Sequence, residues 1–466
     1  MSLQVGFVEC NITPPLSCAM AGYADRDHGA TALEDPLKAQ VLFLRNEQTA
    51  IALVCTDLIG VDEETVAEIR QRASKLTELK PQQIMICASH THFGPALRVS
   101  GHREDEQMIA LADKYRKGLI GSLATAISEA ASNSQLACVG YATTRAWGIS
   151  FNRRLVALAG DKSAHVKYTL PTEQAVAASY GGARLADAWP RHGHLGPRLT
   201  PPMEVLEGLS AGIVDNEVPL LRVDTADGRP LATLISFACH AVVGSGDHYA
   251  ISADYPGQAR WAFEQTAGGP LLFAAGCAGD QVPTWRRGNS RQRVGRALGC
   301  QAAKAWQEVG EFADEIALAC TSRTVRLPLP ANYPTPEDIR EKIAGIQDKS
   351  SDEYRRLQWQ LQRVEKVAKT GGASYEMWAA RVGDMGIACT PGETLAEIGL
   401  QIKQRSPFKY TSIISIANAT AAYLCTDHAI REGGYEPGGM NPGGLGTENV
   451  LVEAAVEMLS ELHDTG

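Results

Sequence analysis

Two histidines separated by one residue, His90 and His92, follow the short apolar run QQIMICAS. In an extended backbone, residues i and i+2 lie on the same side, so both imidazoles can face one ion or one reacting group. Imidazole is a common zinc ligand, and the pair is therefore a candidate for metal chemistry. An isolated pair can equally make ordinary hydrogen bonds in a loop, and that alternative stays open on this motif alone.

Three further polar residues fall where predicted apolar strands end. His240 ends ATLISFACH, Glu393 follows GIACTPG, and Tyr423 ends SIISIANATAAY. In open α/β sheets, ligands bind at the carboxyl ends of strands. Two imidazoles and a carboxylate form a recurring catalytic zinc set that leaves a position open for water. We therefore expect the strand ends at His90, His240, Glu393 and Tyr423 to converge on one site.

The elements that must position these residues can be read from hydrophobic periodicity. QVLFLRN and TAIALVCTDLIG read as strands, VDEETVAEIRQRASKL as a helix capped by Asp62, and QQIMICAS as a strand. A second helical stretch follows over residues 104–132. Four later runs, PLATLISFACHAVV, GPLLFAAG, GDMGIACTPGE and YTSIISIANATAAYL, read as buried strands. The alternation predicts an α/β fold with mixed β-sheets covered by helices.

The sequence shows no internal repeat and no clear linker, so we expect residues 1–466 to form a single large, elaborated catalytic domain. Residues 161–206 are dense in Pro, Gly, Arg and His and predict an irregular excursion over the surface or over a site. Residues 335–370 contain two polar helical patterns, which predict a helical hairpin inserted between strands.

Composition excludes several classes of protein. The chain is 44% hydrophobic and carries 44 basic against 53 acidic residues with no basic run, so nucleic acid is not an expected partner. No apolar run reaches the length of a membrane helix, and we expect no transmembrane segment. The N-terminus has no secretory signal pattern and the 11 cysteines form no CxxC pair, which favours a cytoplasmic location with reduced thiols.

Two competing motifs offer other chemistry. His192 and His194 form a second H-x-H pair, but they lie in the irregular segment with no rigid strand beneath them. Gly208 to Gly212 matches G-x-S-x-G around Ser210, which suggests a serine hydrolase. A nucleophile elbow needs a strand before the serine and a helix after it, and the flanking residues supply neither convincingly. The remaining histidines are interpreted as surface or supporting residues: His28, His102, His165, His248, His428 and His463.

Several motifs in a fixed order resemble the neutral or alkaline non-lysosomal ceramidases, which are zinc amidases. The specific ones are ASHTHFGP and TPGET. Weaker ones are ITPP, MAGYADRD, FNRR, FACHAVV, ISADYPG, FAAGCAGDQVP, NATAAY and GGYEP, and together they run nearly the whole length of the chain.

The resemblance implies roles for individual residues. It implies His90, His240, Glu393 and Tyr423 as ligands of one zinc ion per chain, with His92 as general base. It further implies that Arg153 and Tyr435 contact the substrate and stabilise the developing oxyanion. The residue types and strand ends had already indicated the four ligands, whereas Arg153 and Tyr435 rest on the resemblance alone.

Three departures from the family pattern concern the substrate. The family's serine in the motif before the Gly-Asp step appears here as Gly276, so any role of that hydroxyl at this substrate-binding position is lost. From the resemblance we also expect the chain to correspond to the catalytic domain without the C-terminal β-domain of ceramidases, and to be without their secretory signal. These departures put ceramide itself in question and leave the metal chemistry intact.

We therefore predict a zinc-dependent hydrolase of a C–N amide bond that acts on a small N-acyl amide through a metal-activated water. Another divalent ion that accepts two imidazoles and a carboxylate would also suit the site. Two alternatives remain. One is a metal-independent serine esterase that uses Ser210, and the other is a non-catalytic metal- or ligand-binding relative of the amidases, which the glycine at position 276 keeps open.

Overall fold

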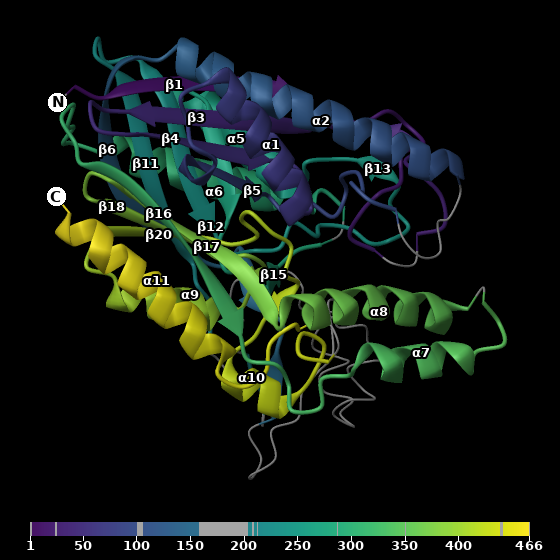
Figure 1. Cartoon of the computed structure of the whole chain (residues 1–466). Helices are drawn as coiled ribbons and strands as arrows, with labels where there is room; N and C mark the ends of the chain where they lie inside the picture. Colours follow the sequence, from purple (N-terminus) through teal and green to yellow (C-terminus); the bar gives the residue numbers. More distant parts are fainter. Residues whose placement is uncertain are drawn as a thin grey trace.

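The fold is built from two stacked β-sheets with helices on their outer faces (Figure 1). The larger sheet has eight strands in the order β14-β12-β11-β6-β1-β3-β4-β5, and the smaller has four in the order β16-β17-β18-β20. Both contain parallel and antiparallel neighbours. The computed structural model describes residues 2–23, 26–99, 106–157, 204–206, 209–211, 213–286, 288–349, 351–438 and 441–465.

Strand and helix boundaries follow the apolar runs closely. The large sheet comprises β1 (Gln4–Asn11), β3 (Lys38–Arg45), β4 (Ala50–Thr56), β5 (Ile84–Ala88), β6 (Gln135–Arg145), β11 (Glu217–Thr225), β12 (Pro230–Phe237) and β14 (Leu271–Ala275). The small sheet comprises β16 (Leu318–Leu327), β17 (Ala373–Val382), β18 (Met385–Cys389) and β20 (Tyr410–Ile414). Three two-stranded sheets pair β2 (Ala32–Leu33) with β13 (Ala250–Ile251), β7 (Ser150–Asn152) with β15 (Gln281–Pro283), and β19 (Glu393–Thr394) with β21 (Tyr423–Leu424). A three-stranded sheet consists of β8 (Leu155–Ala157), β10 (Leu209–Ala211) and β9 (Glu204–Leu206).

The described helices are α1 (Glu63–Leu76), α2 (Glu106–Ser132), α5 (Asp254–Ala267), α6 (Ser290–Gln307), α7 (Pro336–Ala344), α8 (Asp352–Thr370), α9 (Ala396–Arg405), α10 (Asp427–Glu432) and α11 (Thr447–Asp464), with a short 3-10 turn at Pro81–Gln83. The expected cap of α1 is present, because the Asp62 carboxylate accepts a hydrogen bond from the Thr65 backbone at 3.1 Å. Helices α7 and α8 form the projecting pair at residues 335–370 (Figure 1).

Successive side chains of one strand point to opposite faces of the large sheet and pack in two different core layers. In β3, Val41 packs in the layer that contains α1 and α2, whereas Leu42 packs in the layer between the two sheets. Trp378 of β17, in the small sheet, packs in this layer between the two sheets. Helices α5 and α6 cover β11, β12 and β14, and α9 and α11 cover the outer face of the small sheet. The mixed α/β fold expected from the sequence is confirmed.

The two ends of the large sheet come together. Edge strand β14 contacts β4 and edge strand β5. We call the gap between β14 and β5 the seam, and the segment after β20 fills it. The Ser415 backbone N–H donates to the Ala275 carbonyl of β14 at 2.8 Å, and the Asn418 N–H donates to the Ile86 carbonyl of β5 at 2.8 Å. The carboxyl ends of β5 and β12 and the segments that follow β18 and β20 therefore meet in one region.

The described helices include none that is long and apolar enough to cross a membrane. The predicted excursion at residues 161–206 lies almost entirely outside the described residues, as do His165 and the His192/His194 pair.

Candidate metal centre

The backbone turns sharply where β5 ends and presents His90 to the site. His90 has a φ of 62°, a left-handed conformation that is costly for a residue with a β-carbon. Its side chain is buried, whereas that of His92 is half-buried. His240, which follows β12, is also buried. The structure thus brings together residues that are far apart in the sequence at one edge of the sheets.

Three imidazoles and one carboxylate converge at this point. The ligand atoms of His90, His92 and His240 all lie within 4.8 Å of one another. Nε2 of His92 is 3.2 Å from Nε2 of His90, while Oε2 of Glu393 is 3.0 Å from Nε2 of His240 and 3.4 Å from Nε2 of His90. The His90/His92/His240 cluster could hold a metal ion.

The outer nitrogen of each ring is held by a backbone carbonyl. His90 Nδ1 lies 2.7 Å from the Ile59 oxygen, His92 Nδ1 lies 3.0 Å from the Gly22 oxygen, and His240 Nδ1 lies 2.6 Å from the Ala278 oxygen. A carbonyl only accepts, so each Nδ1 carries the proton and each Nε2 presents a lone pair inward. Facing lone pairs beside a carboxylate repel unless a cation lies between them. This second-sphere pattern is that of metal-ligating histidines, and the residues fit a metal ion.

Burial and neighbouring groups shift the pKa values of His92, His240 and Glu393. Burial lowers the pKa of His240 to about 4, and burial together with His90 and His240 holds the pKa of His92 well below its usual value. Burial opposes ionisation of Glu393, but His90 and His240 outweigh it and lower the carboxyl pKa well below its ordinary range. At neutral pH the imidazoles of His92 and His240 are therefore neutral and the Glu393 carboxylate is ionised.

Glu393 and Tyr423 reach the site as direct partners across the β19–β21 ladder. The Tyr423 ring stacks on the His240 ring with centroids 6.4 Å apart. Burial and Glu393 raise the pKa of the Tyr423 phenol well above its usual value, and its Oη accepts a hydrogen bond from Arg153 Nη2 at 3.1 Å. Tyr423 thus joins the cluster to the arginine beside it.

Arg153 is buried next to the cluster and held on three sides. Its Nε donates to Glu436 Oε1 at 2.8 Å, and its Nη2 donates to the Gly279 carbonyl at 2.8 Å as well as to Tyr423. Within the described part of the chain, its Nη1 has no hydrogen-bond partner. The partly exposed Tyr435 ring lies 5.6 Å from that of Tyr423 and 5.5 Å from the Arg153 guanidinium. Arg153 and Tyr435 therefore lie side by side at this edge of the centre.

Gly276 occupies a tight position in the seam of the sheets. Its carbonyl accepts a hydrogen bond from Ser415 Oγ at 2.5 Å, and a β-carbon at position 276 would lie 3.0 Å from the Ala238 nitrogen and 3.1 Å from the Phe237 carbonyl carbon. These backbone neighbours give a side chain little room. The described contacts of Gly276 are with backbone and Ser415, and none is with the histidine cluster.

Comparison with known proteins shows what this arrangement is similar to. No protein-family model and no curated protein matches the chain. Among solved structures, neutral ceramidase from Pseudomonas aeruginosa matches with a TM-score of 0.70 and 18% identity, over 100% of this chain and 75% of that chain. The chain has the neutral ceramidase fold. A ceramidase complexed with C2 matches with a TM-score of 0.69 and 15% identity, over 100% of this chain and 76% of that chain.

Ser210 has a different setting in this ceramidase-like fold from the one that a serine nucleophile needs. It lies inside strand β10, paired on one side with β8 and on the other with β9. A nucleophile elbow requires a sharp turn between a strand and a helix. The backbone at Ser210 therefore does not support the esterase alternative.

The sequence analysis did not identify the backbone carbonyls that orient the three histidine rings, nor Glu436, which orients Arg153. The carbonyl partners of His90, His92 and His240 are 31, 70 and 38 positions away in the sequence, so no local pattern could reveal them. Glu436 was also missed, although it directly follows Tyr435 in the GGYEP motif. A charged residue inside an otherwise Gly- and Pro-rich motif is the one signal that could have indicated it.

Proposed function

We propose that this protein is a zinc-dependent hydrolase that cleaves the C–N bond of an N-acyl amide. The observation that supports this most directly is the inward convergence of the Nε2 atoms of His90, His92 and His240 on the Glu393 carboxylate, with every Nδ1 fixed by a carbonyl. His90, His240, Glu393 and Tyr423 would hold the ion. When bound, zinc supplies a water whose pKa is near 7 and polarises the scissile carbonyl.

The remaining side chains have complementary tasks. His92 is the most exposed of the three histidines, and its neutral imidazole would take a proton from the attacking water and give it to the leaving amine. Arg153 is kept cationic by Tyr423 and Glu436 despite its burial, so its Nη1 and the Tyr435 hydroxyl would donate to the oxygen on which negative charge develops. Both donors are already beside the cluster before substrate arrives.

Metal content tests the first half of the proposal. We expect about one zinc per chain in wild-type protein purified without added metal, and loss of that zinc in His90→Ala. His463→Ala, which alters a histidine on the last helix, is the matched control and retains the ion. Another divalent metal at the same stoichiometry would change the identity of the ion, and no metal in the wild type would remove the main support for this function.

Turnover tests the second half. His92→Ala should keep most of the bound metal and lose turnover of N-acyl amides, because its expected role is proton transfer; such groups contribute about 10² to 10⁴-fold in rate. Near-normal activity of this variant would contradict the assignment. Bound metal with no hydrolysis across a panel of N-acyl amides would favour the non-catalytic relative, and activity that is insensitive to chelator but lost in Ser210→Ala would favour the esterase.

A further inference from the structure

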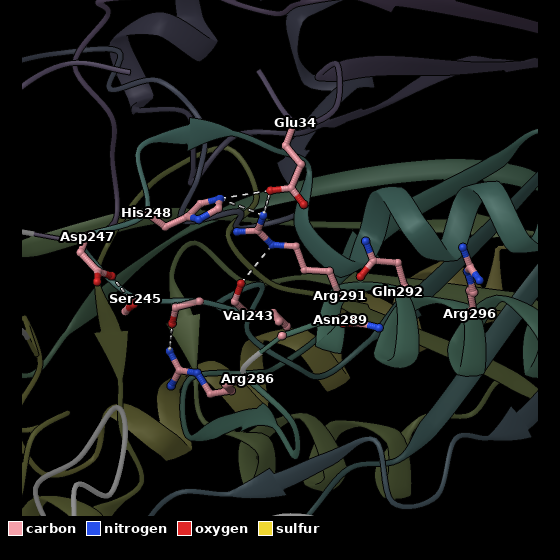
Figure 2. A pocket seen from close by; sticks show the side chains of 12 residues that line it. Glu34, Val243, Ser245, Asp247, His248, Arg286, Asn289, Arg291, Gln292 and Arg296 are labelled. Atoms are coloured by element: carbon pink, nitrogen blue, oxygen red, sulfur yellow. Dashed lines mark hydrogen bonds and ion pairs between the residues drawn. The ribbon is translucent and has the colours of Figure 1, made fainter. Parts of the chain in front are cut away.

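A polar cavity of about 940 Å³ is lined by residues that follow the candidate ligand His240 in the sequence and by the start of helix α6 (Figure 2). One wall is the segment from Val243 to His248, which begins three residues after the candidate ligand His240. The opposite wall is the start of helix α6, with Arg291, Gln292 and Arg296. The loop that follows the candidate ligand His240 therefore forms part of the cavity lining.

The start of α6 favours negative charge in this cavity. The helix has 18 residues, its N-cap Asn289 makes no side-chain capping bond, and its first turn contains no acidic residue. Because Asn289, Arg291 and Gln292 line the cavity, the positive end of the helix dipole lies at this part of the lining, with no acidic residue in the helix's own first turn. Anions bind readily at such helix starts.

Arginines reinforce this preference. The side chain of Arg291 is only 7% exposed, yet its buried Nη2 has no hydrogen-bond partner among the described residues. Two acids also line the cavity, and both are engaged. Glu34 pairs with Arg291 and lies 3.1 Å from His248 Nε2, and Asp247 accepts a hydrogen bond from the Ser245 hydroxyl. Arg286 and Arg296 add two further positive charges to the lining.

Arg286 joins the cavity to the candidate metal centre. Its Nε donates to the Val242 carbonyl at 2.8 Å, and its Nη2 lies 3.4 Å from the Tyr23 hydroxyl and 3.4 Å from the Gly244 carbonyl. The Tyr23 ring in turn packs edge-on against the His92 ring, with centroids 5.3 Å apart. A group bound at Arg286 would therefore be one aromatic ring away from the proposed general base.

We propose that this cavity binds a carboxylate carried by the amide substrate, with Arg286 as the residue that recognises it. The inference rests on the proposed amide hydrolysis and narrows its substrate class to N-acyl amides that bear an anionic group near the scissile bond, as N-acyl amino acids do. A guanidinium pairs with a carboxylate through two parallel hydrogen bonds, which a neutral lipid headgroup cannot match.

Binding of two non-hydrolysable ligands tests the inference without requiring turnover. The ligands are the ketomethylene analogues of N-acetylphenylalanine and of N-acetylphenethylamine, which differ by one carboxylate. We expect wild-type protein to bind the carboxylate ligand at least ~10-fold more tightly in calorimetry, the lower end for a charged pair in a partly desolvated site. Arg286→Gln should abolish this ratio and Arg286→Lys should keep part of it.

The matched control is Arg293→Gln, which removes an arginine of helix α6 that stacks on Trp285 and does not line the cavity. It should keep the wild-type ratio. If Arg286→Gln does not fold, Arg296→Gln, which removes another arginine of the lining, should lower the ratio instead. Equal affinity for the two ligands in the wild type, or an unchanged ratio in the folded Arg286→Gln variant, would overturn the inference.

The two proposals fail in distinguishable ways. In one outcome, the protein prefers the carboxylate ligand in an Arg286-dependent way and yet hydrolyses no amide. That result would support the anion site and contradict the hydrolase. Rapid hydrolysis of amides with no preference for the carboxylate, in binding or in kcat/KM, would support the hydrolase and contradict the anion site.

Discussion

Glu436 is a buried carboxylate shared by two arginines. Its Oε1 accepts from Arg153 Nε at 2.8 Å and its Oε2 accepts from Arg154 Nη1 at 2.7 Å. Burial opposes its ionisation, but the two guanidinium groups lower its pKa below the ordinary value. Removing one charge of a buried pair leaves the others uncompensated. Glu436 is therefore the positioning residue for Arg153.

Glu436→Gln should keep the bound metal and lower kcat by about 10 to 100-fold with a smaller change in KM, because the oxyanion donor loses its fixed orientation. Steady-state kinetics together with metal analysis would measure this. Glu432→Gln is the control, since Glu432 pairs with Arg154 at 3.2 Å, whereas Glu436 pairs with both arginines. An unchanged kcat in folded, metal-loaded Glu436→Gln would show that Arg153 needs no such support.

Gly22 leaves room for His92. Its φ is 99°, its carbonyl accepts the His92 Nδ1–H at 3.0 Å, and a β-carbon there would lie 2.6 Å from the His92 ring and from His92 Cβ. Glycine is thus required both by the backbone conformation and by the close approach of the imidazole.

Gly22→Ala should displace His92 and lower kcat/KM about 100-fold, the scale expected from a misplacement of about 1 Å. Gly228→Ala separates this effect from backbone strain, because Gly228 also has a positive φ of 83° but nothing within 4 Å of an added β-carbon. Both variants should lose thermal stability through backbone strain, and Gly22→Ala should lose more because its β-carbon meets His92, while only Gly22→Ala loses activity. Equal activity of the two variants would exclude a steric role at position 22.

At the scale of elements, the first turn of α5 is held by a buried acid. Asp254 is fully buried with a φ of 58°, and its carboxylate accepts the Tyr255 backbone N–H at 2.7 Å and the Val243 N–H at 2.8 Å. This joins α5 to the loop after His240. Burial raises the Asp254 pKa from 3.8 to about 6 in spite of the nearby Arg291.

The raised pKa predicts how stability depends on pH. From about pH 4 to 6 the folded chain retains a proton at Asp254 that the unfolded chain releases, so this contribution is fully present below about pH 4 and is lost as the pH rises through about 6. The shift corresponds to about 3 kcal/mol of unfolding free energy. Urea denaturation across this pH range should therefore show a shallower fall in Asp254→Asn than in the wild type.

Asp464→Asn, which alters an exposed carboxylate at the end of α11, should keep the wild-type pH dependence. If the wild type and Asp254→Asn show the same pH dependence of unfolding, Asp254 does not hold an excess proton in the folded state.

Elements were more predictable than the connections among them. The strands around Val54 and Ile86 and the helix after Asp62 follow from apolar runs and a capping carboxylate, which are local signals. The contact between edge strands β14 and β5 is not local, because it depends on the curl of the whole sheet and on the Ser415 and Asn418 backbone that fills the seam. Strand ends could therefore indicate the candidate ligands but not the carbonyls that accept hydrogen bonds from their rings.

At the scale of the whole molecule, the candidate metal centre connects the two sheets. His90 and His240 follow strands of the large sheet, whereas Glu393 follows β18 of the small sheet. An ion bound by all three would link the layers at one edge. In the absence of the ion, the facing imidazole lone pairs and the carboxylate would repel one another across the same seam.

Metal removal should consequently lower global stability as well as activity. An ion present at 100 times its dissociation constant stabilises the folded state by about 2.7 kcal/mol, so a strong chelator should lower the Tm of the wild type by several degrees. His90→Ala already lacks a ligand, and its Tm should start lower and not respond to the chelator. A wild-type Tm that stays constant while metal analysis shows the ion has gone would mean that the seam holds without it, because hydrogen bonds such as Ser415 N–H to the Ala275 carbonyl suffice to join the sheets.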